Sequence, residues 1–308
     1  SNVTIQGTGA RKLAVSGNNA SRVFQVNAGA TVRIRGLTVT GGRVESEAGG
    51  GILNLGTLVV LDSAITSNVI AGNSAVDMRG GGLSSGASGH PGAVTTVVNS
   101  TFSGNSAYLG GGAATFGSCS LTLINCTFSG NSAVFGGALH SEGHASAFHS
   151  TIIGNNANSG GGVVIGLGSG SLANSIVAGN SASSGRPDIE RFNIATFASN
   201  GGNLIGNGQD TANAVTWHSS DLTGTTAAML DPKLGPLQDN GGPTDTRALL
   251  AGSPAINNGL AANLPADTYD LDGDLDTTEP IPFDQRGPGF PRVVVPRIDI
   301  GAFESPNA

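Results

Sequence analysis

Short apolar runs alternate with polar turns along most of this chain. Runs of three to five residues rich in Leu and β-branched side chains, such as 58–61, 121–124 and 163–165, are bounded by Gly, Asn and Ser. This pattern of period two predicts short β-strands. No segment keeps apolar residues at the i, i+3, i+4, i+7 spacing between capping residues, so we expect little helix.

A nine-residue sequence recurs along the middle of the chain at intervals close to 25 residues. Its copies read NSTFSGNSA at 99–107, NCTFSGNSA at 125–133, HSTIIGNNA at 149–157 and NSIVAGNSA at 174–182. A glycine pair or triplet recurs in phase with these copies. Repetition at this period predicts a solenoid, in which each repeat buries its apolar side chains only by stacking on its neighbours. We therefore predict an all-β fold, a right-handed, single-stranded parallel β-helix.

The repeat predicts which side chains stack on one another. With three short strands in each coil, Phe102 and Phe128 should lie one coil apart in the core. Strands separated by ~4.8 Å would give about 12 coils and a rod of roughly 60 Å. Five asparagines that fall at the same turn should form a ladder of side-chain amides, in a turn whose left-handed backbone Asn tolerates. These are Asn68, Asn105, Asn131, Asn155 and Asn180.

The regularity of the repeat divides the chain into two parts. We expect residues 1–185 to form regular coils, and residues 186–308, where Pro and charged residues are more frequent, to form irregular coils and the cap of the same solenoid. A cap is needed because a bare terminal coil exposes unpaired strand edges. Trp217, the single tryptophan, is either a plug over the apolar end or a platform on which a sugar stacks.

Composition narrows the class of protein further. The chain has 50 Gly, 11% charged residues, a formal net charge of −7 and two cysteines, Cys119 and Cys126. With no basic run and no long apolar stretch, it predicts neither nucleic-acid binding nor a membrane-spanning segment. The two cysteines flank an extended run too long for a disulfide, so we expect two small buried thiols. The chain begins directly in strand-like sequence, so we expect that an export signal has been removed.

The repeats resemble two kinds of bacterial surface protein. The pairing of GGAL at 136–139 with FSGN at 102–105 and 128–131 is similar to the repeats of polymorphic outer-membrane-type adhesins. The C-terminal third, with DQRG at 284–287 and DIGAFE at 299–304, resembles β-helix proteins with choice-of-anchor domains. The resemblance covers nearly the whole chain. It implies the β-helix fold and a location outside the cell or on the bacterial surface, but no particular activity.

An acidic loop is the clearest candidate for a metal site. Asp270, Asp272, Asp274, Asp276 and Glu279 alternate with other residues around a glycine. Carboxylates in this arrangement can converge on Ca²⁺, which takes six to eight oxygen ligands. The spacing departs from that of the EF-hand loop, and a solvated acidic loop without an ion is the alternative. For a bound calcium ion, we expect a role in holding a long loop in place rather than in catalysis.

Two further groups of polar residues are weaker candidates. His140, Glu142, His144 and His149 fall on one predicted coil and could bind a transition metal or relay protons, although their spacing matches no known zinc motif and exposed polar residues are the alternative. Arg33 and Arg35 share one face of a strand near Glu45 and Glu47. They could bind an acidic sugar, but surface ion pairing explains them equally well.

No set of residues fixes a reaction, and the catalytic residues, if any, are unknown. The acids of the regular coils are sparse, and no two neighbouring coils supply carboxylates in phase for glycoside hydrolysis. Our first hypothesis is a secreted or surface-displayed adhesin-like protein that binds polysaccharide or another surface glycan and is able to associate end to end. The alternative is a polysaccharide lyase or glycoside hydrolase with its site on one sheet face or in the loops of 186–285.

Overall fold

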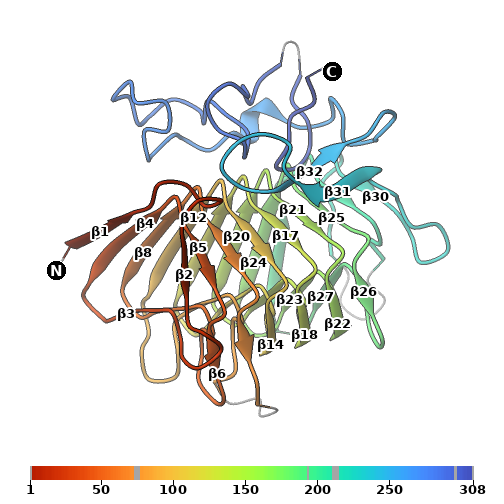
Figure 1. Cartoon of the computed structure of the whole chain (residues 1–308). Helices are drawn as coiled ribbons and strands as arrows, with labels where there is room; N and C mark the ends of the chain where they lie inside the picture. The colour runs from red at the N-terminus through yellow and green to blue at the C-terminus, as the bar shows by residue number, and fades with distance from the viewer. Residues whose placement is uncertain (1, 73–76, 193, 210–214, 295–296, 307–308) are drawn as a thin grey trace.

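The chain winds into a parallel β-helix of about eight turns (Figure 1). The structure, a computed structural model, describes residues 2–72, 77–192, 194–209, 215–294 and 297–306. Within these residues each complete turn crosses four parallel sheets, which we name A, B, D and C in chain order. The 3₁₀ turn η1 (Ala261–Asn263) is the only helical element that the described residues contain. The predicted fold class is confirmed.

The strands of each sheet lie in consecutive coils and pair in register. Sheet A contains β1 (Asn2–Gln6), β4 (Thr31–Arg35), β8 (Thr57–Leu61), β12 (Val94–Val98), β16 (Ser120–Ile124), β20 (His144–Phe148), β24 (Ser169–Ala173) and β28 (Thr196–Ser199). Sheet B contains β2 (Ala14–Ser16), β5 (Thr38–Thr40), β9 (Ala64–Thr66), β13 (Thr101–Ser103), β17 (Thr127–Ser129), β21 (Thr151–Ile153), β25 (Ile176–Ala178), β29 (Leu204–Ile205) and β30 (Leu222–Thr223).

The other two sheets complete each turn. Sheet C contains β3 (Phe24–Val26), β7 (Ile52–Asn54), β11 (Leu83–Ser85), β15 (Ala113–Thr115), β19 (Leu139–Ser141), β23 (Val163–Ile165) and β27 (Ile189–Arg191). Sheet D contains β6 (Arg43–Val44), β10 (Val69–Ile70), β14 (Ser106–Leu109), β18 (Ser132–Phe135), β22 (Asn156–Ser159) and β26 (Ser181–Ala182). A turn therefore has four strands and not the expected three, because the polar residues that follow the Gly-Asn turn also pair from coil to coil.

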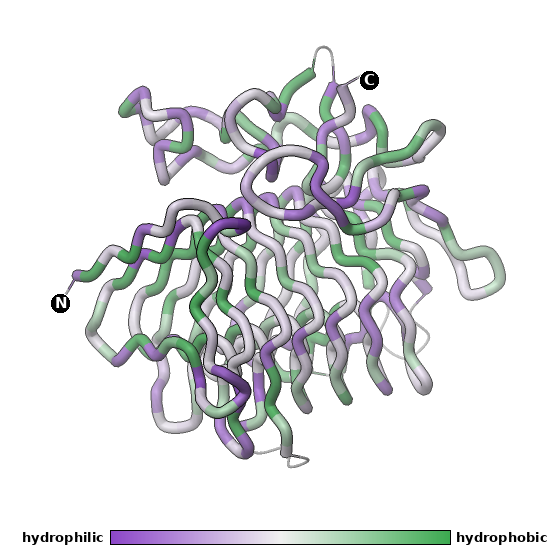
Figure 2. The backbone as a smooth tube through the Cα atoms, viewed as in Figure 1, coloured by the Kyte–Doolittle hydropathy of each residue, from purple (hydrophilic) through white to green (hydrophobic). Residues whose placement is uncertain are grey.

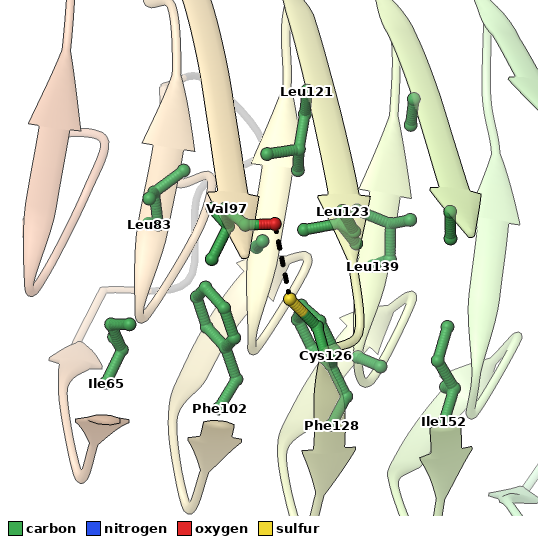
Figure 3. Packing of buried hydrophobic residues seen from close by; sticks show 14 of the residues in the cluster. Ile65, Leu83, Val97, Phe102, Leu121, Leu123, Cys126, Phe128, Leu139 and Ile152 are labelled. Atoms are coloured by element: carbon green, nitrogen blue, oxygen red, sulfur yellow. Dashed lines mark hydrogen bonds between the residues drawn. The ribbon is translucent and has the colours of Figure 1, made fainter. Parts of the chain in front are cut away.

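The core is a thin stack of inward-pointing side chains. The rings of Phe102 and Phe128 stack with their centroids 4.3 Å apart and their planes 4° from parallel, and Ile65 and Ile152 continue this column (Figure 3). Hydrophobic and hydrophilic residues alternate at short intervals along every coil (Figure 2). This alternation follows from the pleat of a strand, which points successive side chains to opposite faces. The predicted stacking of equivalent residues is confirmed.

The predicted asparagine ladder runs unbroken through five coils. Each side-chain Nδ2 donates to the Oδ1 of the next member at 2.9–3.0 Å, from Asn68 through Asn105, Asn131 and Asn155 to Asn180. The residues that adopt the left-handed backbone are not the ladder asparagines. They are the residues before them, Ser67 and four glycines, together with a second column before the sheet B strands that includes Asn99 and Asn125.

The number of coils is smaller than expected because the chain stops winding after β30. The described residues of 225–306 instead run back along the side of the β-helix, which Figure 1 shows as the blue segment lying beside the coils. This C-terminal segment contains one antiparallel pair, β31 (Leu234–Gln238) and β32 (Thr246–Leu249). It covers the outer face of sheet B, where Thr101 donates to the Asp245 carbonyl oxygen and Thr127 to Gln285 Oε1, both at 2.6 Å.

The motifs DQRG and DIGAFE fasten the C-terminal segment. Arg286 donates to both carboxylate oxygens of Asp284, at 2.6–3.2 Å, and its guanidinium lies between the rings of Phe290 and Phe303, 4.0 and 3.7 Å from their centroids. Fully buried Arg292 binds Glu304 at 2.6 Å. We call Asp284, Arg286, Arg292, Asp299 and Glu304 the clasp. These contacts hold parts of the segment together, and Arg292 also donates to Asn125 Oδ1 on the coils at 3.4 Å.

Both cysteines are buried, and neither forms a disulfide, as the sequence predicts. The Sγ of Cys126 lies 3.4 Å from the carbonyl oxygen of Val97 in the coil before it (Figure 3). Burial raises the pKa of the Cys126 thiol to about 12, so the thiol stays protonated and packs as a small apolar group. No helix among the described residues is long and apolar enough to cross a membrane.

Candidate functional site

The acidic loop extends from the C-terminal segment over the C-terminal ends of three sheet A strands. Leu271 and Ile281 pack on Leu61, Val98 and Ile124, the last residues of three sheet A strands. The backbone N–H of Asp267 donates to the carbonyl oxygen of Glu279 at 2.7 Å, which brings the two ends of the acidic run together. Residues 12 positions apart in sequence thus become neighbours.

The loop brings carboxylate oxygens together in two overlapping groups. In each group, one oxygen from every member lies within 4.8 Å of the others. One group contains Asp270, Asp272 and Asp274, and the other contains Asp267, Asp272 and Glu279. The structure therefore gathers four of the five residues expected from the sequence. Asp276 belongs to neither group, and its carboxylate accepts hydrogen bonds from the backbone N–H and hydroxyl of Thr278.

Asp267 is the member of this site that the spacing of the acids does not single out. Its side chain is 1% exposed, and its Oδ2 accepts the Leu271 N–H at 2.7 Å. Burial raises the pKa of the Asp267 carboxyl, and the charges of Asp272 and Asp270 raise it further. The sequence does contain one signal, because Asp267 begins the acidic run, but its burial depends on how the loop closes.

The four residues of the histidine cluster do not converge. His140 lies at the centre of β19 on sheet C, whereas His144 begins β20 on sheet A and is exposed. His149 lies in the left-handed turn after β20, where its Nε2 is 3.1 Å from Asn174 Nδ2. Burial holds the pKa of His149 well below its ordinary value, with Arg292 adding to the shift. His149 thus takes the place of an asparagine in a structural column.

His140 and Glu142 lie close to a buried arginine. Arg79 donates to Glu142 Oε2 from its Nε at 3.0 Å and forms an ion pair with Asp77 at 3.0 Å, while its guanidinium lies 4.0 Å from the centroid of the Phe116 ring. Burial lowers the pKa of His140 to about 3, and the charge of Arg79 adds to this effect. A neutral imidazole beside a paired arginine makes a packed polar layer on sheet C.

Arg33 and Arg35 do share a face of β4, but their neighbours differ from those expected. Arg35 binds Asp62 at 2.7 Å, and the Arg33 guanidinium carbon lies 5.7 Å from the centroid of the Tyr269 ring in the acidic loop. The expected partners Glu45 and Glu47 instead pair with Arg43 and Arg22 at 3.1 and 2.6 Å. The reason is the extra strand of sheet D, which carries residues 43 and 44 away from sheet A.

Trp217 packs on the last part of the core. Its ring meets that of Phe197 on β28 edge to face, with centroids 5.8 Å apart, and its Nε1 donates to the Gly208 carbonyl oxygen at 2.8 Å. The side chain is half-buried against the core. This arrangement agrees with a plug over the apolar end of the stack.

The outer face of sheet A carries aligned columns of hydroxyl groups. In its five-residue strands the second and fourth side chains enter the core, so the first and third point outward. We call the resulting surface the hydroxyl face. Between β12 and β28 it contains Thr96, Ser120, Thr122, His144, Ser146, Ser169, Ser171 and Thr196, with the apolar Val94 and Ala198 at the remaining positions of the two columns. Some members bond along the stack, as Ser171 Oγ does to Ser146 Oγ at 2.8 Å and His144 Nδ1 does to Ser169 Oγ at 2.7 Å.

Comparisons of the chain with protein-family models, with curated proteins and with solved structures found no match.

Proposed function

We propose that this protein is a secreted or surface-displayed β-helix that binds polysaccharide through the hydroxyl face. The observation that carries the proposal is the register of sheet A, which aligns Thr96, Thr122, Ser146 and Ser171 in consecutive coils. Coil-to-coil spacing of ~4.8 Å makes this a periodic array of hydroxyl donors and acceptors. An extended polysaccharide is also a periodic array of hydroxyl groups, so each coil can meet the next sugar in the same way.

The chemistry of the face favours many weak contacts over one strong contact. Each hydrogen bond exchanged with water contributes only about 0.5–1.5 kcal/mol, so affinity must accumulate along the chain of the ligand. No acid or base other than His144 lies on the hydroxyl face. An uncharged face suits a neutral glycan. We also propose that the β-helices associate end to end, which would lengthen the array of hydroxyl groups.

A polysaccharide panel with two matched double variants tests this proposal. Lysines introduced by Thr122→Lys with Ser146→Lys project from the hydroxyl face. The control, Ser132→Lys with Asn156→Lys, places the same charges on the same two coils but on exposed positions of sheet D. Affinity electrophoresis should show binding of the unmodified protein to at least one glycan. We expect the first variant to weaken it by about tenfold or more, roughly 1.4 kcal/mol, and the control by less than about twofold.

The same panel separates binding from catalysis. New reducing ends, or absorbance from unsaturated uronate, would support the alternative of a glycoside hydrolase or a polysaccharide lyase and would overturn the proposal. Equal loss of binding in the two double variants would also overturn it, because binding would then depend on net charge and not on the hydroxyl face. So would the absence of binding across the panel.

A further inference from the structure

Backbone hydrogen bonds and apolar packing close the base of the acidic loop. Apart from the Asp267–Glu279 bond, the Ile281 N–H donates to the Pro265 carbonyl oxygen at 2.9 Å, and Ala266 bridges to Pro280. Leu271 is 8% exposed and lies against the sheet A edge. The positions of Asp267 and Glu279 are therefore set by backbone hydrogen bonds and by packing on sheet A, and Asp272 directly follows the packed Leu271.

Two buried carboxylate oxygens in this loop have no hydrogen-bond partner. They are Oδ1 of Asp267, in a side chain that is 1% exposed, and Oε1 of Glu279. Both residues belong to the group whose oxygens lie within 4.8 Å of one another. Among the described residues, no ion pair joins an Arg, Lys or His to any carboxylate of residues 267–279. An ionised carboxylate buried in this way is costly unless a cation compensates it.

The electrostatics agree with that need. The pKa of Glu279 is raised by desolvation and by the charges of Asp274, Asp272, Asp276 and Asp267. The raised pKa of Asp267 has the same two kinds of cause. The carboxylates thus repel one another at short range. A divalent cation bound among them would replace this repulsion with attraction.

We propose that Asp267, Asp272 and Glu279 bind one calcium ion, and that the ion secures the acidic loop against sheet A. Ca²⁺ fits better than a transition metal because the donors are all carboxylate oxygens, with no imidazole or thiolate in either group. Asp270 and Asp274 share Asp272 with the first group and can supply further oxygens to reach the coordination number that Ca²⁺ requires. This site does not depend on glycan binding.

Titration of the full chain with Ca²⁺ alone, after removal of divalent ions, tests the site. Isothermal calorimetry should show one ion bound per chain with a Kd on the order of 0.1 mM or tighter. Asp267→Asn should weaken binding by about tenfold or more, since it removes one ligand charge. The control Asp276→Asn removes the same charge from the same loop but outside both groups, and it should change Kd by less than about threefold, the effect of long-range charge alone.

Melting temperatures in chelator and in calcium distinguish loss of calcium binding from misfolding of the variant. Asn at position 267 can still accept the Leu271 N–H, so the variant should fold, as circular dichroism would verify. In chelator, Asp267→Asn should melt at the same temperature as the unmodified protein or higher, because an uncompensated buried carboxylate is removed. In calcium the unmodified protein should melt higher than the variant. Absence of calcium binding at millimolar concentration, or equal weakening by Asp267→Asn and Asp276→Asn, would overturn the proposal.

Discussion

The coils and the C-terminal segment solve the problem of burial in different ways. In the coils, identical or similar side chains stack at one spacing, as Phe102 and Phe128 do, and five buried asparagines form a neutral ladder of amides. In the C-terminal segment the five clasp residues, all buried, are charged. Arg292 is 0% exposed and Asp284 is 0% exposed, and both are held by ion pairs and hydrogen bonds to backbone groups.

The difference follows from repetition. A ladder extends by one identical amide hydrogen bond for each coil, so its members are equivalent and uncharged. Only its last member meets an acidic side chain, where Asn180 Nδ2 donates to Asp188 Oδ1 at 2.9 Å. The C-terminal segment has no repeat and must attach once, at one position along the coils. Charged pairs with fixed geometry specify such a position better than apolar contact alone. The coils should therefore tolerate local damage, whereas the clasp should fail as a unit.

The largest effect is expected from Arg292→Ala. The arginine binds Glu304, the carbonyl oxygens of Gly301 and Asp299, and Asn125 Oδ1 on the coils. Removing one partner of a buried ion pair costs about 3–5 kcal/mol, so the C-terminal segment should detach at lower denaturant concentration. Limited proteolysis should then cleave residues 225–306 before the coils.

The exposed pair between Arg43 and Glu45 provides the control for this variant. Arg43→Ala removes a partner at 3.1 Å on the surface and should change stability by less than about 1 kcal/mol. If Arg292→Ala leaves the proteolysis pattern and the denaturation midpoint unchanged, the clasp does not hold the segment. The contrast with the coils would then have no energetic basis.

Breaking the asparagine ladder should have a smaller and more local effect. Asn131→Ala removes the Oδ1 that accepts from the backbone N–H and the Nδ2 of Asn105. It also removes the Nδ2 that donates to the Phe102 carbonyl oxygen and to Asn155 Oδ1. Leaving such buried groups unpaired costs about 1–3 kcal/mol each, but neighbouring coils can relax, so we expect roughly 2–4 kcal/mol in total. The free energy of urea unfolding measures this loss.

The matched control is Asn158→Ala, which truncates an exposed asparagine in the following coil whose side-chain Oδ1 accepts the Ser183 hydroxyl at 3.3 Å. It should change the free energy of unfolding by less than about 0.5 kcal/mol. Hydrogen exchange should show increased opening of the strands around residue 131 while residues 225–306 remain protected. Loss of protection in both regions at once would mean that the coils and the segment unfold together.

The sequence is informative where the structure repeats. The spacing of 99–107 and 125–133 predicts the Phe stack and the ladder, because stacking forces equivalent residues into register. The path of residues 225–306 could not be predicted in this way. Its contacts join residues far apart in sequence, such as Gln285 with Thr101, and no periodic signal marks them.

The candidate sites follow the same rule. Alternating acids predict that carboxylates gather in the loop, which the groups around Asp272 confirm, whereas the burial of Asp267 depends on the Asp267–Glu279 backbone bond and on packing against sheet A. The histidines fall on one coil in sequence, yet a coil turns through four sheets. His140 and His149 therefore lie in different sheets and turns, and proximity along the chain does not make them neighbours.

The smallest effect on stability is expected from a change of pH, which should act on the charged clasp and not on the neutral asparagine ladder. The clasp places three carboxyl groups, Asp284, Asp299 and Glu304, beside two guanidinium groups, Arg286 and Arg292. Burial raises the pKa of Glu304 to about 7, against the opposing effect of Arg292 and with a further contribution from Asp299. Because this pKa is raised on folding, the stability that Glu304 contributes is complete below its unfolded value near 4.5 and is lost as pH rises through about 7.

Thermal unfolding between pH 4.5 and 8 should therefore show a loss of roughly 1–3 kcal/mol that Glu304→Gln largely removes. Some slope should remain in that variant, since Asp188 and Asp299 also have a raised pKa through burial. The cost of Arg292→Ala should be larger at pH 8 than at pH 5.5, because only an ionised Glu304 is left uncompensated. An unaltered slope in Glu304→Gln would show that the excess proton of the clasp resides on another carboxyl group, for which Asp299→Asn is the next variant to measure.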